Sequence, residues 1–152
     1  MISQSYNTFK YKEVNCLPLD ELANYKDKYT EMNLRELAVC FLEKHDFKYH
    51  DTKMIEFENG LEQKIDFIIT GQKNTELDSV KTGLIVKDYK KSTGSDTICQ
   101  IERLLKDLPQ INQIILLSNE FSVPARNLAE RCGVPTISRG ELISMLWNPN
   151  KY

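Results

Sequence analysis

The sequence lacks long apolar runs and a strong excess of charge of either sign. Its longest apolar runs are about six residues, far short of the ~20 that span a bilayer, and the first twelve residues contain no apolar signal core. We therefore expect a cytoplasmic protein with no membrane contact. Its 20 Lys and Arg residues face 22 Asp and Glu residues, giving a formal net charge of −2. Any nucleic-acid contact must then come from a local basic patch.

Cysteine and histidine are also sparse. The four cysteines show no CxxC spacing and no Cys/His metal pattern: Cys16, Cys40, Cys99 and Cys132. We expect them to be buried, reduced thiols of a cytoplasmic protein. His45 and His50 are too few for a zinc motif and are expected at the surface or at a boundary.

At 152 residues, 41% of them hydrophobic, the chain can bury one domain core. We divide it into an N-terminal extension, residues 1–31, and a domain, residues 32–152. The extension is polar with interleaved tyrosines and Phe9. It either docks on a partner or nucleic acid, or packs on the edge of the domain.

The clearest expected helix runs from Asn33 to Asp46, because its apolar residues recur at helical spacing from Leu34 to Leu42. Asn33 is a plausible N-cap, and Glu36 three residues later would complete a capping box. Alternatively, Glu36 points into a catalytic cleft.

Three strands are expected to follow as an antiparallel meander: residues 48–57, 61–70 and 81–89. Asn59-Gly60 between the first two is a strong hairpin signal, because both residues tolerate positive φ. The remaining chain alternates between helix and strand, which indicates a parallel component. The expected elements are a helix at 96–108 capped by Asp96 and ended by Pro109, a strand at 112–118, a helix at 122–132, a strand at 134–137 and a helix at 139–147 capped by Ser138.

Two of the apolar runs carry charge where a buried strand should have none. Asp66 interrupts Ile65 and the residues 67–69, and Lys87, Asp88 and Lys90 crowd the end of the third strand. Burying an unpaired charge is costly, so such groups pair, reach solvent or bind a metal. The simplest alternative is a solvated strand end without function.

The order of elements and several short segments resemble the PD-(D/E)xK nuclease superfamily, and within it the Mrr-like branch. The segments that carry the resemblance are Ile65-Asp66, Val86–Lys91, Gln100, Leu117–Ala125, Ala129–Pro135 and Gly140–Leu142. The resemblance covers about residues 33–146. It implies an α/β fold, namely a restriction-endonuclease-like three-layer αβα sandwich with a mixed central sheet.

The resemblance also implies a chemistry. Asp66, Asp88 and Glu36 would hold Mg²⁺, a cation that prefers oxygen ligands, and Lys90 or Lys87 would support the attacking hydroxide or the charged phosphate. Lys91 and Gln100 would contact nucleic acid. DNA is the implied partner, bound by a monomer, a homodimer or a larger complex.

Two alignments of the third strand lead to different functions. If Lys87 is the family lysine, the acid two residues earlier becomes Ile85, which cannot bind a metal. If Asp88-Tyr89-Lys90 is the motif, the site keeps its acid on the opposite face of the strand. The first alignment indicates a degenerate module that binds nucleic acid or a protein partner. The second indicates a Mg²⁺-dependent endonuclease.

Overall fold

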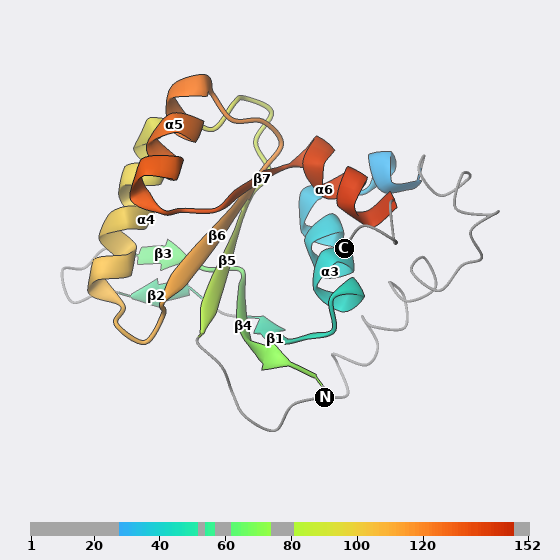
Figure 1. Ribbon diagram of the computed structural model, residues 1–152, viewed down its shortest axis with the longest axis horizontal. Helices are drawn as coiled ribbons and strands as arrows, with labels where there is room; N and C mark the ends of the chain where they lie inside the picture. The colour runs from blue at the N-terminus through green and yellow to red at the C-terminus, as the bar shows by residue number, and fades with distance from the viewer. Residues whose placement is uncertain (1–27, 52–53, 57–61, 74–80, 148–152) are drawn as a thin grey trace.

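The protein is built in three layers around a central sheet, as seen in a computed structural model that describes residues 28–51, 54–56, 62–73 and 81–147 (Figure 1). The strand order in the sheet is β1-β4-β5-β6-β7. Its strands are β1 (Phe47–Asp51), β4 (Phe67–Gln72), β5 (Thr82–Lys87), β6 (Gln113–Ser118) and β7 (Thr136–Ser138). Two helices cover each face: α3 (Leu34–Lys44) and α6 (Arg139–Trp147), and opposite them α4 (Ser95–Asp107) and α5 (Val123–Cys132).

The sheet is mixed, as the sequence predicted. The strands β1, β4 and β5 pair antiparallel, and β5, β6 and β7 pair parallel. The expected αβα sandwich with a mixed central sheet is therefore confirmed. Because sequential antiparallel strands need only short connections while parallel strands need a crossover, the helices α4 and α5 belong to the parallel half.

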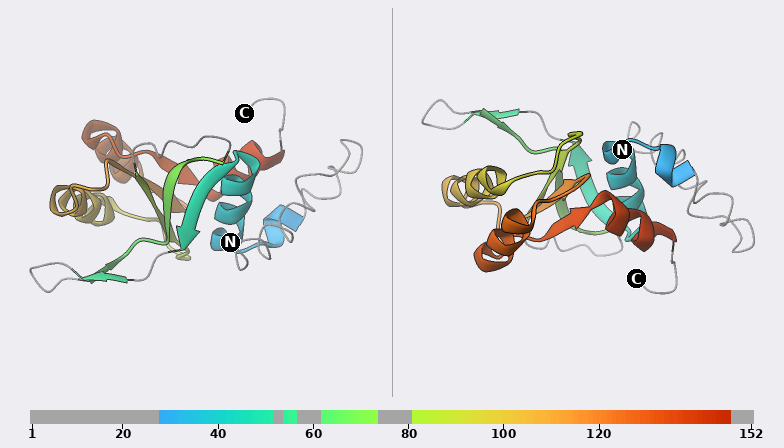
Figure 2. Two further views of the ribbon diagram at one scale, coloured as in Figure 1. Left: turned by 90° about the horizontal axis from the view of Figure 1, so that it is seen from below. Right: turned by 90° about the horizontal axis from the view of Figure 1, so that it is seen from above.

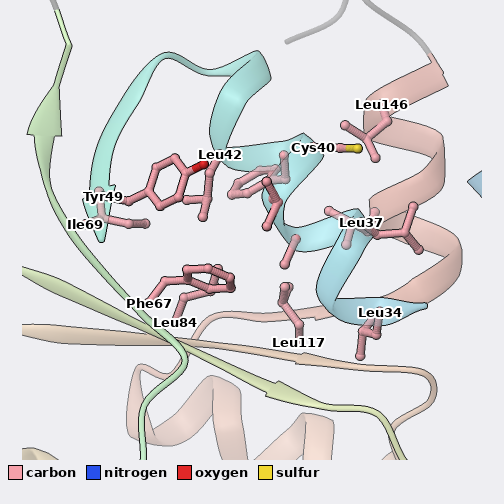
Figure 3. Packing of buried hydrophobic residues seen from close by; sticks show 14 of the residues in the cluster. Leu34, Leu37, Cys40, Leu42, Tyr49, Phe67, Ile69, Leu84, Leu117 and Leu146 are labelled. Atoms are coloured by element: carbon pink, nitrogen blue, oxygen red, sulfur yellow. The ribbon is translucent and has the colours of Figure 1, made fainter. Parts of the chain in front are cut away.

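Helix α3 begins as its sequence predicts. The Asn33 side chain accepts a hydrogen bond from the Glu36 N–H at 2.8 Å, and the Glu36 carboxylate accepts one from the Asn33 N–H at 3.1 Å. Glu36 is thus the capping partner, the first of its two alternatives. The apolar face of α3 packs on the sheet and on α6, with Leu34, Leu37 and Leu42 toward the core (Figure 3).

In the second half of the chain the helix boundaries lie close to the predicted ones, but one predicted cap is wrong. Helix α5 matches the predicted range 122–132 to within one residue, because Ser122 caps it and Gly133 ends it at φ 72°. Asp96 does not cap α4; the helix begins one residue earlier, after an extended Gly94 that gives no side-chain cap, and Asp96 lies in the first turn. There its charge complements the helix dipole instead.

The two expected long strands around the hairpin are each divided. The first becomes β1 and β2 (Met54–Glu56), and the second becomes β3 (Glu62–Lys64) and β4. β2 and β3 pair only with each other and extend from the sheet as a separate ribbon (Figure 2). The strand expected at 134–137 also begins later, as β7. Residues 1–27, with Cys16, and the turn Asn59-Gly60 lie outside the described residues.

The cysteine prediction holds only in part. Cys40 is buried and Cys132 is half-buried, but Cys99 is exposed on α4, so the expectation of burial is wrong there. His45 is half-buried and His50 is exposed, as expected. No helix in the described part of the chain is long and apolar enough to cross a membrane.

We predict that His45 makes the stability of the protein depend on pH. Its ring stacks against Phe41 and Phe47, and its Nε2 atom is buried without a hydrogen-bond partner. Burial, with the neighbouring Lys44 charge, lowers the pKa of His45 below its ordinary value of 6.5. The unfolded chain therefore binds this proton more tightly, and the free energy of unfolding should fall as the pH decreases from about 7 through the folded pKa.

Urea unfolding at pH 7 and at pH 5 measures this effect. The substitution His45→Phe keeps the stacking and should reduce the dependence, whereas His50→Gln at the exposed histidine should leave it unchanged. Equal dependence in wild type and His45→Phe would contradict the prediction.

Candidate functional site

Asp66 lies in the break between β3 and β4, where it ends the antiparallel ladder to β5. Its N–H donates to the Leu84 carbonyl at 2.9 Å, and its Oδ2 atom accepts the Val86 N–H at 2.7 Å. The Asp66 side chain thus accepts a hydrogen bond from a backbone N–H of β5. A backbone carbonyl would accept this bond if β4 continued toward the N-terminus. Only 5% of Asp66 is exposed, so the carboxylate needs further compensation.

Arg35, in the first turn of α3, supplies that compensation. Its Nη1 atom lies 2.9 Å from Asp66 Oδ1, and its Nη2 atom lies 3.1 Å from the exposed Asp51. The guanidinium also sits 4.5 Å from the centre of the Phe67 ring, within the range of a cation–π contact. Three contacts, two of them with the adjacent residues Asp66 and Phe67, therefore hold a positive charge beside the predicted catalytic aspartate.

Asp88 lies at the same end of α3. Its Oδ2 atom accepts the Leu34 N–H at 3.4 Å, and its Oδ1 atom accepts from Asn119 Nδ2 at 2.8 Å. The first N–H groups of a helix have no partner within the helix, so a carboxylate there satisfies a donor and complements the dipole. The structure thus brings Asp66 and Asp88 to adjacent residues of one helix, each hydrogen-bonded to the protein.

The side chains of β5 alternate between the two layers. Leu84 and Val86 belong to the core on the α3 side, while Ile85 is 1% exposed and belongs to the core on the α4 side. Lys87, two residues after Ile85, follows the same alternation. Asp88 is therefore on the face of Val86, and Lys87 is on the other face.

These surroundings do not fit a Mg²⁺ ion. Such an ion requires several oxygen ligands in near-octahedral geometry, whereas Asp66 faces a guanidinium and Ile85 supplies no ligand. Glu36 serves its capping box on the exposed side of α3. Within the ranges that the structure describes, no group of three or more His, Cys, Asp or Glu side chains is arranged to hold a metal.

The remaining predicted residues lie around the end of β5 and the start of α4. Lys90 and Lys91 are exposed in the connecting loop, and Gln100 is exposed on α4. The Nζ atom of Lys87 lies 5.7 Å from the centre of the Tyr89 ring. Lys87, Lys90 and Lys91 thus form a basic surface at the end of β5.

Arg35 and Asn119 were missed from the sequence. Arg35 gives one local signal, because a cation in the first turn of a helix opposes the dipole and needs a reason to be there. Asn119 gives none, because its role depends on the parallel register that places Lys87 opposite Ser118.

The three αβα layers and the strand order β1-β4-β5-β6-β7 define a restriction-endonuclease-like α/β fold. The family model described as restriction endonuclease matches residues 27–146, and the chain belongs to that family. No curated protein matches the chain.

Two solved structures are similar. One is the crystal structure of a protein of unknown function, with a TM-score of 0.53 and 20% identity over 67% of this chain and 54% of that chain. The other is EndoMS in apo form, with a TM-score of 0.43 and 14% identity over 70% of this chain and 46% of that chain. This chain spans about half the length of both proteins. The first likeness agrees with the three-layer fold.

We predict that Arg35 is required for stability through Asp66. The substitution Arg35→Ala removes a guanidinium from the buried Asp66 carboxylate and should cost about 1–3 kcal/mol, less than a fully buried pair because Arg35 is 41% exposed. Asp51→Ala, which removes only the exposed partner of the same arginine, should change stability by less than about 0.5 kcal/mol. Urea unfolding measures both, and equal losses would show that Asp66 does not depend on Arg35.

Proposed function

We propose that this chain is a nuclease-fold module that binds DNA and has lost metal-dependent cleavage. The observation that supports the loss of cleavage is the ion pair between Arg35 and Asp66. A divalent cation at Asp66 would have to approach a fixed guanidinium, and the neighbouring family position, Ile85, offers it no oxygen. Electrostatic repulsion by Arg35 and the missing oxygen ligand both weaken the binding of a divalent cation.

The support for DNA binding is the basic surface that follows β5. Lys90 and Lys91 are exposed, and Lys87 is partly exposed beside them. Helix α4 begins directly after this loop without a side-chain cap. The N–H groups of the first turn of a helix and nearby lysines are suited to phosphate oxygens.

The overall charge makes this a weak binder on its own. With a net charge of −2, the chain has no long-range attraction to a polyanion. A homodimer or a larger complex would add a second basic surface and raise the affinity through multivalency. The exposed lysines of each chain would then position the DNA on the protein and supply only part of the affinity.

A Mg²⁺-dependent endonuclease is the second candidate, favoured by one observation. Asp66 and Asp88 both contact the start of α3, through Arg35 and Leu34. With Lys90 as the lysine they could form a two-carboxylate site, provided that Arg35 moved away. Rotation of one arginine costs little backbone change, so a cleavage assay must decide.

We predict salt-dependent DNA binding that requires the loop lysines. Fluorescence anisotropy with a labelled oligonucleotide should show affinity falling as salt rises, because bound lysines release counterions. Replacing both Lys90 and Lys91 by alanine should reduce affinity on the order of tenfold and lower the salt slope by about one per lost phosphate contact. The control is Lys106→Ala, which removes one positive charge at the far end of α4. Undetectable binding at low salt would reject the DNA role.

We also predict no nicking of supercoiled DNA by the wild-type protein with Mg²⁺ or Mn²⁺. The matched controls are Asp66→Asn and Asp107→Asn, an exposed aspartate at the end of α4. Nicking that disappears with Asp66→Asn and persists with Asp107→Asn would establish the endonuclease instead.

A further inference from the structure

The loop between β5 and α4 is held at its first end by one side chain. Asn119, directly after β6, donates from Nδ2 to Asp88 Oδ1 and to the Tyr89 carbonyl, both at 2.8 Å. Asp88 is held in turn by the Leu34 N–H of α3. The backbone at Tyr89 is therefore fixed from two directions.

The second end of the loop is held by the connection between β6 and α5. The Thr93 N–H donates to the Glu120 carbonyl at 2.8 Å, and the Ser122 N–H donates to the Thr93 carbonyl at 3.0 Å. The Thr93 and Ser118 hydroxyls lie 2.5 Å apart, and both residues are buried. A short loop fixed at both ends loses little conformational entropy when a ligand binds it.

This fixed loop presents an aromatic ring to solvent. Tyr89 is 50% exposed, and among the described residues only Val123 joins it as an exposed large hydrophobic side chain. The ring stands beside Lys87, 5.7 Å from its Nζ atom, and precedes the exposed Lys90 and Lys91. An exposed aromatic ring between cations is the arrangement that binds unpaired bases, with the ring stacking on the base and the lysines contacting the phosphates.

We propose that Tyr89 is a base-stacking residue and that the ligand of this surface is nucleic acid with unpaired bases rather than intact duplex. This inference rests on the nucleic-acid binding proposed above. In a duplex the base faces are covered by their neighbours, so the ring could contact only sugar and phosphate, whereas a single strand exposes a face to it. The lysines read phosphate in both cases, and the ring alone distinguishes the two ligands.

The test compares a fluorescein-labelled thymidine oligonucleotide with a duplex of the same length, by anisotropy on the full chain. We expect the wild-type protein to prefer the single strand, Tyr89→Leu to lose single-strand affinity on the order of tenfold, and Tyr89→Phe to retain it. Duplex affinity and the salt slope should be unchanged in both variants, because no charge is removed. Both should melt as the wild type does, since the side chain is half exposed.

A spectroscopic readout separates stacking from a merely structural role. An oligonucleotide that carries 2-aminopurine should lose fluorescence when bound to wild type and to Tyr89→Phe, and lose less when bound to Tyr89→Leu. Val123→Leu is the control for an exposed apolar side chain outside the loop.

The outcomes distinguish this inference from the function on which it rests. If neither ligand binds at low salt, nucleic-acid binding is wrong and this inference with it. If both bind equally and Tyr89→Leu changes nothing, binding stands and stacking is wrong. Equal losses in Tyr89→Phe and Tyr89→Leu would assign the effect to the hydroxyl group and would also overturn stacking.

Discussion

A buried carboxylate that must find positive partners determines much of this structure. The Asp66 carboxylate accepts the Val86 N–H of β5 in place of a backbone carbonyl, and Arg35 of α3 balances its charge. The pair therefore fixes the start of β4 and the start of α3 against each other. Asp66 is also the aspartate that the family resemblance predicted to be catalytic, so one interaction connects the packing with the loss of cleavage that we propose.

The end of β5 is stabilised by similar means. Asp88 accepts from the first N–H of α3 and from Asn119, which also holds the Tyr89 carbonyl. Asp88, a predicted metal ligand, thus connects α3 to the residue that follows β6. The consequence is a rigid, lysine-flanked surface beside a site that is poor in metal ligands. We propose that this surface binds nucleic acid without hydrolysing it.

The sequence predicted those parts of the fold that depend on local signals. Helical spacing with the cap at Asn33 located α3, and the predicted ranges 122–132 and 112–118 lie within one residue of α5 and β6. The break in the strand at Asp66 and the partners of Asp66 and Asp88 had no comparable local signal. Arg35 reaches Asp66, and Asn119 reaches Asp88, each across 31 residues. Alternation along β5 showed that Ile85 and Asp88 face opposite layers, but only packing showed that Asp88 contacts α3.

The most direct test of the ion pair's role is a crystal structure of the protein soaked in Mn²⁺, which reports the metal through its anomalous signal. The account predicts no manganese at Asp66 and the Arg35 guanidinium still on Oδ1. Manganese bound between Asp66 and Asp88, with Arg35 turned away, would contradict it.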